Sequence, residues 1–214
     1  MRFFKRPQNS SSYLIEIRLS GSAKRYVKNL IFDVAFKFSV SGVTSKKVVP
    51  HITVLGPLKT RNEQKLIKET MTICRKYDLM TIKFEGIRTF NRWFSKDKVI
   101  GIKIKPSAEL DKLREELSEK LDAFCQLNKY DTKKWKPHST IAFKDIDIKF
   151  GEIRKHVKKQ NIPEINHHVI RVTIIKGQKI LCEYDFLQRR TLNRQEALSR
   201  KNKQKTLRLL KEKT

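Results

Sequence analysis

Hydrophobic and polar positions follow two periods along this chain, and the periods predict strands and helices in a repeating order. Residues 12–19 alternate apolar and polar side chains, the pattern of a half-buried strand. Residues 21–37 carry Leu30, Ile31 and Val34 at helical spacing. Extended along the chain, the patterns predict strands at 12–19, 48–55, 79–89, 98–105 and 135–143, and helices at 21–37, 59–77, 106–127 and 148–159.

Turn and capping residues punctuate these elements. Gly56-Pro57 predicts the end of the second strand, and Ser107 is the candidate N-cap of the helix that follows Pro106. Residues 166–176 and 179–189 predict a hairpin across Gly177-Gln178.

The order strand, helix, strand, helix, strand occurs twice, which indicates an internal duplication. Ile15 lies 51 − 15 = 36 residues before His51, and Ile100 lies 138 − 100 = 38 residues before His138. We therefore expect an α+β bilobed, duplicated fold, in which two antiparallel-sheet lobes with helices outside flank a pseudo-twofold cleft. The expected boundaries are one domain over 1–190, with lobes at 1–93 and 94–190, and a basic helix or tail at 191–214.

The charge of the chain predicts a polyanionic partner. The 214 residues include 49 Lys and Arg against 22 Asp and Glu, a formal net charge of +27. Such an excess repels itself and attracts nucleic acid through phosphate contacts. Residues 188–214 hold ten Lys or Arg and two Glu, and read equally well as a solvated terminus or as an RNA-binding arm.

Composition also narrows the cellular setting. No stretch has the length and apolarity of a membrane span, and the basic start lacks the apolar run of a secretory signal. The three cysteines form no close pair, which is typical of a reducing compartment. We expect a cytoplasmic monomer that does not bind membranes.

The candidate chemistry lies in two short repeats, Pro50-His51-Ile52-Thr53 and Pro137-His138-Ser139-Thr140. Side chains at i and i+2 of a strand share a face, so each repeat presents an imidazole beside a hydroxyl. Two imidazoles can act as acid and base near neutral pH, while Thr53 and Thr140 hydrogen-bond phosphate oxygens. No cysteine or carboxylate lies near either repeat in a ligand-like spacing, so we expect neither metal nor cofactor.

The duplicated His-x-Thr repeats resemble those of the 2H phosphoesterase superfamily, in particular the 2′-5′ RNA ligase / RNA 2′,3′-cyclic phosphodiesterase family. The resemblance spans about residues 13–192. It implies a metal-independent enzyme that opens RNA 2′,3′-cyclic phosphates to a 2′-phosphate. In some members it implies joining of tRNA halves or cleavage of 2′-5′ linkages. It also implies His51 as general acid and His138 as general base.

The resemblance extends to substrate binding, with one departure. Members of the family often carry an arginine shortly after the second repeat, where this chain has Phe143 followed by Lys144. Lys144 replaces the charge, although strand alternation places it on the face opposite Phe143.

An aromatic residue flanked by cations supplies a second candidate for substrate binding. Phe90 lies between Arg88 and Arg92, the composition of a platform that stacks a base and contacts phosphate. Phe90 or Trp93 filling a hairpin core is the equal alternative.

Two other functions compete with the catalytic hypothesis. A non-catalytic, basic RNA-binding protein with vestigial histidines would account for the net charge alone. A catalytic site for a small cyclic nucleotide would keep the histidines, but a small phosphate needs only a few cations.

Overall fold

The structure is a computed structural model, and it describes residues 11–45, 47–90, 98–131 and 134–213. The candidate residues Arg92 and Trp93 lie outside these ranges. The strands are β1 (Ser11–Arg18), β2 (His51–Thr60), β3 (Met80–Phe90), β4 (Val99–Pro106), β5 (His138–Phe143), β6 (Asn166–Val169), β7 (Arg171–Lys176), β8 (Lys179–Asp185) and β9 (Arg190–Asn193). The helices are α1 (Gly21–Phe38), α2 (Glu63–Cys74), α3 (Ala108–Asp122), α4 (Phe150–Lys159), α5 (Arg194–Leu198) and α6 (Arg200–Lys213).

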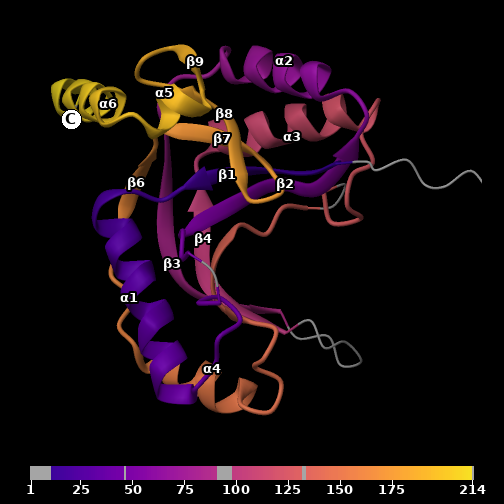
Figure 1. Ribbon diagram of the computed structural model, residues 1–214. Coiled ribbons are helices and arrows are strands. Elements are labelled where there is room, and N and C mark those ends of the chain that lie inside the picture. The colour runs from indigo at the N-terminus through magenta and orange to yellow at the C-terminus, as the bar shows by residue number, and fades with distance from the viewer. Residues whose placement is uncertain (1–10, 46, 91–97, 132–133, 214) are drawn as a thin grey trace, which may run out of the picture.

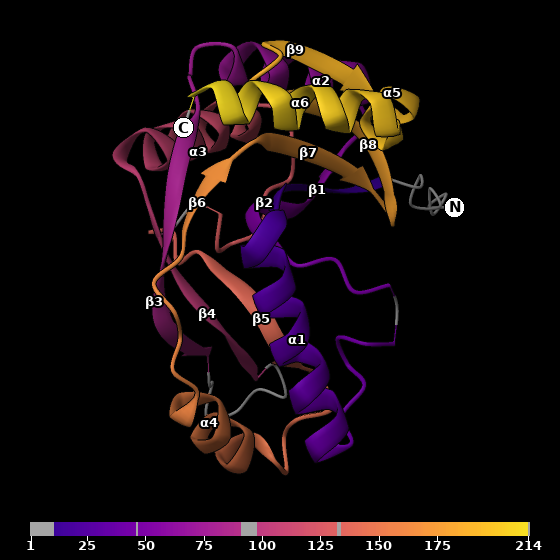
Figure 2. The ribbon, with the colours of Figure 1, turned by 90° about the vertical axis from the view of Figure 1, so that its left-hand side faces the viewer.

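The strands form two antiparallel sheets with helices on their outer sides (Figures 1 and 2). One sheet has the order β2-β1-β7-β8-β9 and the other β5-β4-β3-β6. Helices α2 and α3 pack together against the first sheet, while α1 and α4 contact β5 and β3 of the second (Figure 1). The expected α+β fold of two antiparallel sheets with outer helices is confirmed.

Each sheet takes its strands from both halves of the chain, so the expected lobe boundary near residue 93 does not describe the sheets. β1 and β2 share a sheet with β7, β8 and β9, and β3 pairs with β4 and β6. Hydrophobic alternation gives a strand's buried face but not its neighbour, which explains the difference. The two repeats nevertheless occupy matching places, because β2 and β5 are the edge strands beside β1 and β4.

Helical spacing of apolar residues accounts for the packed helices. The buried positions of α1 include Ala23, Val27, Leu30 and Val34, which recur every three or four residues and face the core. The expected cap is confirmed, because the Ser107 hydroxyl at the start of α3 accepts a hydrogen bond from Leu110 N at 3.4 Å.

The predicted turn at Gly56-Pro57 is instead an irregularity inside a longer strand. β2 continues to Thr60, and its register with β1 shifts opposite Tyr13 and Ile15. Gly56 has a φ of +116°, and its N–H donates to Asp131 Oδ2 at 3.0 Å. A side-chain acceptor thus takes the place of a ladder partner, and α2 begins later than predicted, at Glu63.

The predicted hairpin across Gly177-Gln178 forms between β7 and β8, but its first arm is shorter than expected. Residues 166–176 divide into β6, which pairs with β3, and β7, which pairs with β1 and β8. The chain therefore passes from one sheet to the other at Ile170.

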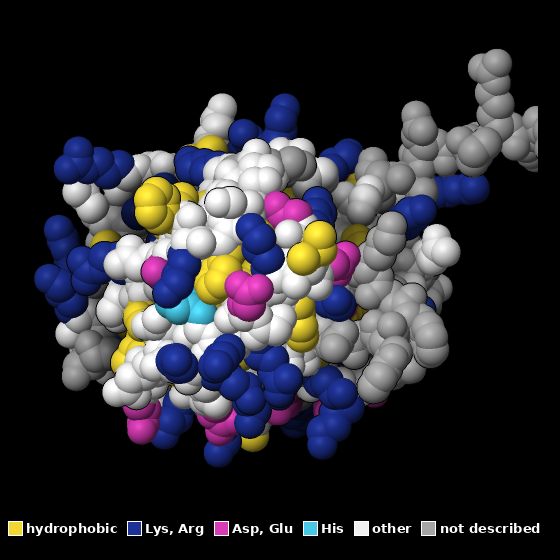
Figure 3. Space-filling model, turned by 90° about the horizontal axis from the view of Figure 1, so that it is seen from below, with side chains coloured by type: hydrophobic (Ala, Val, Ile, Leu, Met, Phe, Trp, Pro, Cys, Tyr) yellow, Lys and Arg dark blue, Asp and Glu magenta, His cyan; other side chains and the backbone are white. Residues whose placement is uncertain are grey.

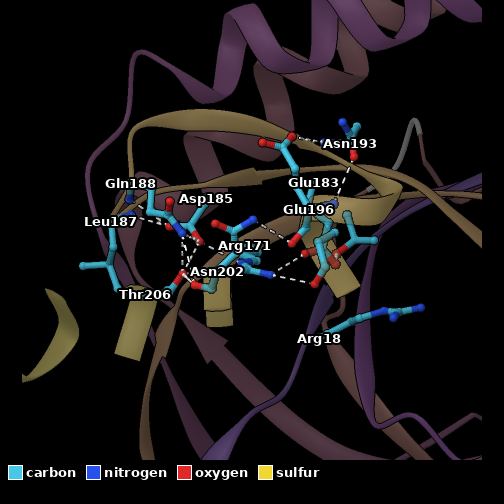
Figure 4. Close-up of polar contacts among 12 residues, drawn as sticks. Arg18, Arg171, Glu183, Asp185, Leu187, Gln188, Asn193, Glu196, Asn202 and Thr206 are labelled. Atoms are coloured by element: carbon cyan, nitrogen blue, oxygen red, sulfur yellow. Dashed lines mark hydrogen bonds and ion pairs between the residues drawn. The ribbon is translucent and has the colours of Figure 1, made fainter. Parts of the chain in front are cut away.

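The C-terminal segment adds β9, α5 and α6 to the first sheet, and a buried polar cluster holds α6 there (Figure 4). Arg171 pairs with Asp185 and Glu183 at 2.8 Å each, and it donates to Thr206 Oγ1 of α6 at 2.9 Å. Thr206 donates in turn to Asp185 Oδ2 at 2.6 Å and accepts from Gln188 Nε2 at 2.9 Å. Polar contacts therefore anchor a helix in which eight of the fourteen residues are charged.

None of the helices within the described ranges combines the length and apolar composition that crossing a membrane requires. The longest helix, α1, buries one apolar stripe and exposes charged residues such as Lys24 and Lys28 on its other side.

Replacing Thr206 with Val should destabilise the protein, because it removes the donor to Asp185 and the acceptor for Arg171 and Gln188. Thr206 is buried at 3% exposure, so the loss should be about 1–3 kcal/mol of unfolding free energy. Urea denaturation measures it, with Thr72→Val on the exposed side of α2 as the matched control. Equal unfolding midpoints for the two variants would show that the cluster does not anchor α6.

Candidate functional site

Both histidine repeats begin edge strands at equivalent positions. His51 opens β2 and pairs with Arg18 of β1, while His138 opens β5 and pairs with Lys103 of β4. The neighbouring threonines, two residues further along, follow on the same faces. The duplicated sequence pattern thus gives duplicated local geometry.

The two imidazole rings are held in the same way. His51 Nδ1 lies 2.8 Å from the carbonyl oxygen of Val49, and His138 Nδ1 lies 3.0 Å from that of Lys136. A carbonyl oxygen only accepts, so Nδ1 carries the hydrogen in both rings. Nε2 is then the nitrogen of each neutral ring that is left to accept or pass on a proton.

One cavity of about 440 Å³ brings the two histidines together. Its walls come from β1, β2 and β5, from the loop before β2, and from the β7–β8 turn. Among the predicted site residues, His51, His138, Thr140 and Lys144 line this cavity, whereas the half-buried Thr53 does not. The lining also contains Glu16, Arg18, Gly42, Val43, Lys47 and Phe143.

The environments of the two rings differ. Burial lowers the pKa of His138, the Lys136 carbonyl opposes that shift, and nearby Arg88 and His51 lower the pKa further. His138 therefore favours its neutral form at neutral pH.

Phe90 and Arg88 contact the second repeat but are not among the residues that line the cavity. The Phe90 ring packs on the His138 ring with centroids 4.7 Å apart and planes at 53°. Arg88 Nη1 donates to the carbonyl oxygen of Pro137 at 3.4 Å. Both residues sit at the end of β3, are half-buried, and contact the second repeat.

Lys144 lines the cavity because the backbone leaves the strand at that point. β5 ends at Phe143, and Lys144 has a φ of +71°, in the left-handed region. Phe143 and Lys144 therefore both line the cavity, so their predicted placement on opposite faces is wrong. Asp145 anchors this segment by accepting hydrogen bonds from the backbone N–H groups of Ser41, at 2.6 Å, and Gly42, at 2.9 Å.

Close packing and one cross-sheet contact keep the repeats in place. A Cβ at Gly101 of β4 would lie 2.8 Å from Ser139 O and 3.2 Å from His138 Cδ2. Only glycine lets β4 approach the second repeat this closely. Trp135 Nε1, just before β5, donates to the carbonyl oxygen of Thr53 in β2 at 3.1 Å.

Two charged residues of β1, which the sequence patterns did not mark as site residues, also line the cavity. Glu16 is 4% exposed, and its Oε1 accepts from Arg18 Nε at 2.7 Å. Its Oε2 lies 3.8 Å from His51 Nε2. The alternation of residues 12–19 places Glu16 and Arg18 on one face of the strand, and that shared face is the signal that could have located them.

The described part of the chain contains no cluster of three or more His, Cys, Asp or Glu side chains arranged to hold a metal ion. The free cysteines are buried, and burial raises the pKa of the Cys74, Cys125 and Cys182 thiols. They are therefore poor nucleophiles at neutral pH.

Comparison with known proteins identifies the family. Residues 39–180, which include both repeats, match the model of the 2′-5′ RNA ligase superfamily, and the chain belongs to this superfamily. No curated protein matches the chain.

Solved structures resemble it at low sequence identity. Escherichia coli LigT in apo form is 14% identical, with a TM-score of 0.48, over 83% of this chain and 98% of LigT. Kluyveromyces marxianus Usb1 with uridine monophosphate is 9% identical, with a TM-score of 0.49, over 86% of this chain and 98% of Usb1.

Gly101→Ala should displace the second repeat, because the added Cβ meets the Ser139 carbonyl oxygen. We expect a loss of about 1–3 kcal/mol in unfolding free energy, measured by urea denaturation, and a shifted His138 ring signal by NMR. Gly151→Ala is the matched control, because a Cβ at Gly151 in α4 meets no atom within 4 Å. An unchanged His138 signal in Gly101→Ala would contradict this account.

Proposed function

We propose that this protein is a metal-independent phosphodiesterase that opens RNA 2′,3′-cyclic phosphates, leaving a 2′-phosphate. The observation that carries the proposal is the pair of histidines in one cavity, with each Nδ1 bonded to a backbone carbonyl and each Nε2 left for chemistry. Membership of the 2′-5′ RNA ligase superfamily supports the same reaction class.

The proposed roles follow from the different surroundings of the rings. Neutral His138 takes a proton from water through Nε2 as the water oxygen bonds to phosphorus. Protonated His51 gives a proton from Nε2 to the 3′-oxygen as the bond from phosphorus to that oxygen breaks. One water is consumed, and the products are a 2′-phosphate and a free 3′-hydroxyl.

The same two groups would catalyse joining of RNA ends. A 5′-hydroxyl of RNA in place of water gives a 2′-5′ linkage, with the proton transfers unchanged. Cleavage of that linkage is the reverse reaction. Cyclic-ended tRNA halves are therefore candidate substrates, as are 2′-5′ oligonucleotides.

Hydroxyl groups and cations would stabilise the charge that develops on the phosphate. Thr140 lines the cavity and can donate to a non-bridging oxygen, and Thr53 holds the equivalent place beside His51. Lys144 supplies a cation at the cavity wall. Phe90 and Arg88 contact the second repeat, and we assign them the task of orienting His138 for substrate, with Arg92 as a further RNA contact.

The charge outside the cavity supports an RNA partner longer than a nucleotide. Figure 3 shows Lys and Arg side chains gathered on the face that carries α4 and the adjoining end of α1. Helix α6 carries seven cations and one acidic residue, and the buried cluster around Thr206 fixes its orientation. A fixed array of cations binds a phosphate backbone at a lower entropic cost than a mobile one.

Turnover of a cyclic-ended substrate tests the proposed reaction. Purified protein should open 2′,3′-cyclic nucleotides and cyclic-ended RNA in excess EDTA. End-group analysis should show a 2′-phosphate. His51→Gln and His138→Gln should each lower kcat by about 10²–10⁴-fold, because each removes one proton-transfer group.

His156→Gln is the matched control for the catalytic variants. His156 pairs with Asp33 between α4 and α1, at 2.7 Å, and does not line the cavity. Full activity in either catalytic variant, or loss of activity on chelation, would rule out the mechanism. RNA binding without turnover of any cyclic phosphate would favour the non-catalytic RNA-binding alternative.

Neutralising α6 should weaken RNA binding and its salt dependence. Replacing Lys201, Lys205 and Arg208 with Gln should flatten the plot of log affinity against log salt by about 2 for single-stranded RNA. Fluorescence anisotropy with a labelled oligonucleotide measures this slope. A comparison variant replaces Arg154, Lys155 and Lys158 of α4 and removes the same charge from the other cationic face. An unchanged slope in the α6 variant would show that α6 does not contact the RNA.

A further inference from the structure

Strand β1 supplies a charged pair to the cavity that the proposed reaction does not yet use. Glu16 and Arg18 both line the cavity, two residues apart on one face of the strand. Each oxygen of the Glu16 carboxylate faces a different partner: Oε1 lies 2.7 Å from Arg18 Nε, and Oε2 lies 3.8 Å from His51 Nε2. Within the described residues, the two Nη nitrogens of Arg18 have no hydrogen-bond partner.

A buried carboxylate in an anion-binding cavity needs a physical reason. The Glu16 side chain is only 5% exposed, so its charge is costly to bury and poorly screened by solvent. Its negative charge also opposes phosphate binding. This desolvation cost is offset only if the carboxylate interacts with positively charged groups. Its two neighbours are the Arg18 guanidinium and the His51 imidazole.

We propose that Glu16 is a positioning residue that keeps His51 protonated as the proton donor, and that Arg18 is its counter-charge, with Nη nitrogens that bind the scissile phosphate. This inference rests on the proposed function and deepens it, because it accounts for the direction of proton transfer. Glu16 acts through His51 and does not itself touch the substrate.

The charges that face His51 support this assignment. From β1 come Glu16 and Arg18, and from β5 comes His138. Among the residues that the structure describes, Lys47 and Lys144 are the other charged groups that line the cavity. The Lys and Arg cations disfavour a protonated His51, and Glu16 is the one carboxylate among the described lining residues. Glu16 therefore provides the electrostatic attraction that an imidazolium at His51 requires.

Arg18 links the charge of His51 to the presence of substrate. While Arg18 pairs with Oε1, the two charges largely cancel at His51. A phosphate bound by the Nη nitrogens adds negative charge next to both cations. The protonated form of His51 is then favoured most when a phosphate is present to receive its proton.

The ring signals of ¹³C-labelled histidine, followed by NMR as a function of pH, test the coupling without any substrate. Glu16→Gln keeps the volume and an acceptor for Arg18 Nε but removes the charge. We expect the His51 signal to lose its proton at a pH lower by about one unit than in the unchanged protein. Arg18→Gln leaves the carboxylate uncompensated, so the same signal should move to higher pH.

Assignment and controls use other variants of the full chain. His51→Gln identifies the signal by its absence, and the remaining histidine signals report that each variant is folded. Glu152→Gln on the exposed side of α4 makes the same charge change away from the cavity and should leave the His51 titration in place.

Kinetics with a 2′,3′-cyclic nucleotide provide the second readout. Loss of activity at high pH reports deprotonation of the acid, so Glu16→Gln should move that limb of the pH profile to lower pH with little change in KM. Arg18→Gln should raise KM, because it removes a phosphate contact. A purely structural role for Glu16 would lower activity at all pH values without moving the limb.

The outcomes separate this proposal from the proposed function. An unmoved His51 titration in Glu16→Gln overturns the proposal whether or not the protein is active. A displaced titration in a protein that turns over no cyclic phosphate supports the coupling and overturns the proposed function. If Glu16→Gln does not fold, the His51 titration in Arg18→Gln becomes the deciding measurement. A His51 titration that moves to lower pH in that variant, or does not move, overturns the proposal.

Discussion

The site depends on the pairing of two edge strands with their neighbours, β2 with β1 and β5 with β4. Each pairing fixes the first residue of an edge strand, and the carbonyl two residues earlier then takes the Nδ1 hydrogen of that histidine. If either pairing were lost, one imidazole would lose the hydrogen bond that fixes both its tautomer and its ring orientation. The geometry of both histidines is thus a property of backbone hydrogen bonding.

Local periodicity was enough to predict the elements but not their partners. The alternation of residues 12–19 correctly indicated β1, and the spacing of Leu30 and Val34 correctly indicated α1. Nothing in a period-2 pattern says that β1 pairs with β7, more than 150 residues later in the chain. The prediction that the second strand ends at Gly56-Pro57 was wrong for a related reason. The hydrogen bond that the strand ladder lacks at Gly56 is supplied by Asp131, from a distant loop.

Some residues of the candidate site could likewise be predicted from the sequence, and others could not. His51 and His138 could be found because an imidazole and a hydroxyl recur at the same spacing in both halves. Lys144 could not be placed, because strand alternation fails where φ becomes positive. Glu16 and Arg18 were overlooked because a charged strand face is usually solvated, and only the second sheet turns this one into a cavity wall.

Electrostatics resolves the ambiguity that a duplicated site creates. The two histidines sit in matching Pro-His-x-Thr repeats, so a difference in role must come from what surrounds them. Burial and the positive charge of Arg88 favour a neutral His138, while a carboxylate approaches His51 from β1. The strand beside each repeat differs in charge. β1 places Arg18 opposite His51 and Glu16 opposite Thr53. β4, the counterpart of β1, places Lys103 opposite His138 but a glycine, Gly101, opposite Thr140. The asymmetry of the proposed acid and base is therefore encoded in the strands beside the repeats rather than in the repeats themselves.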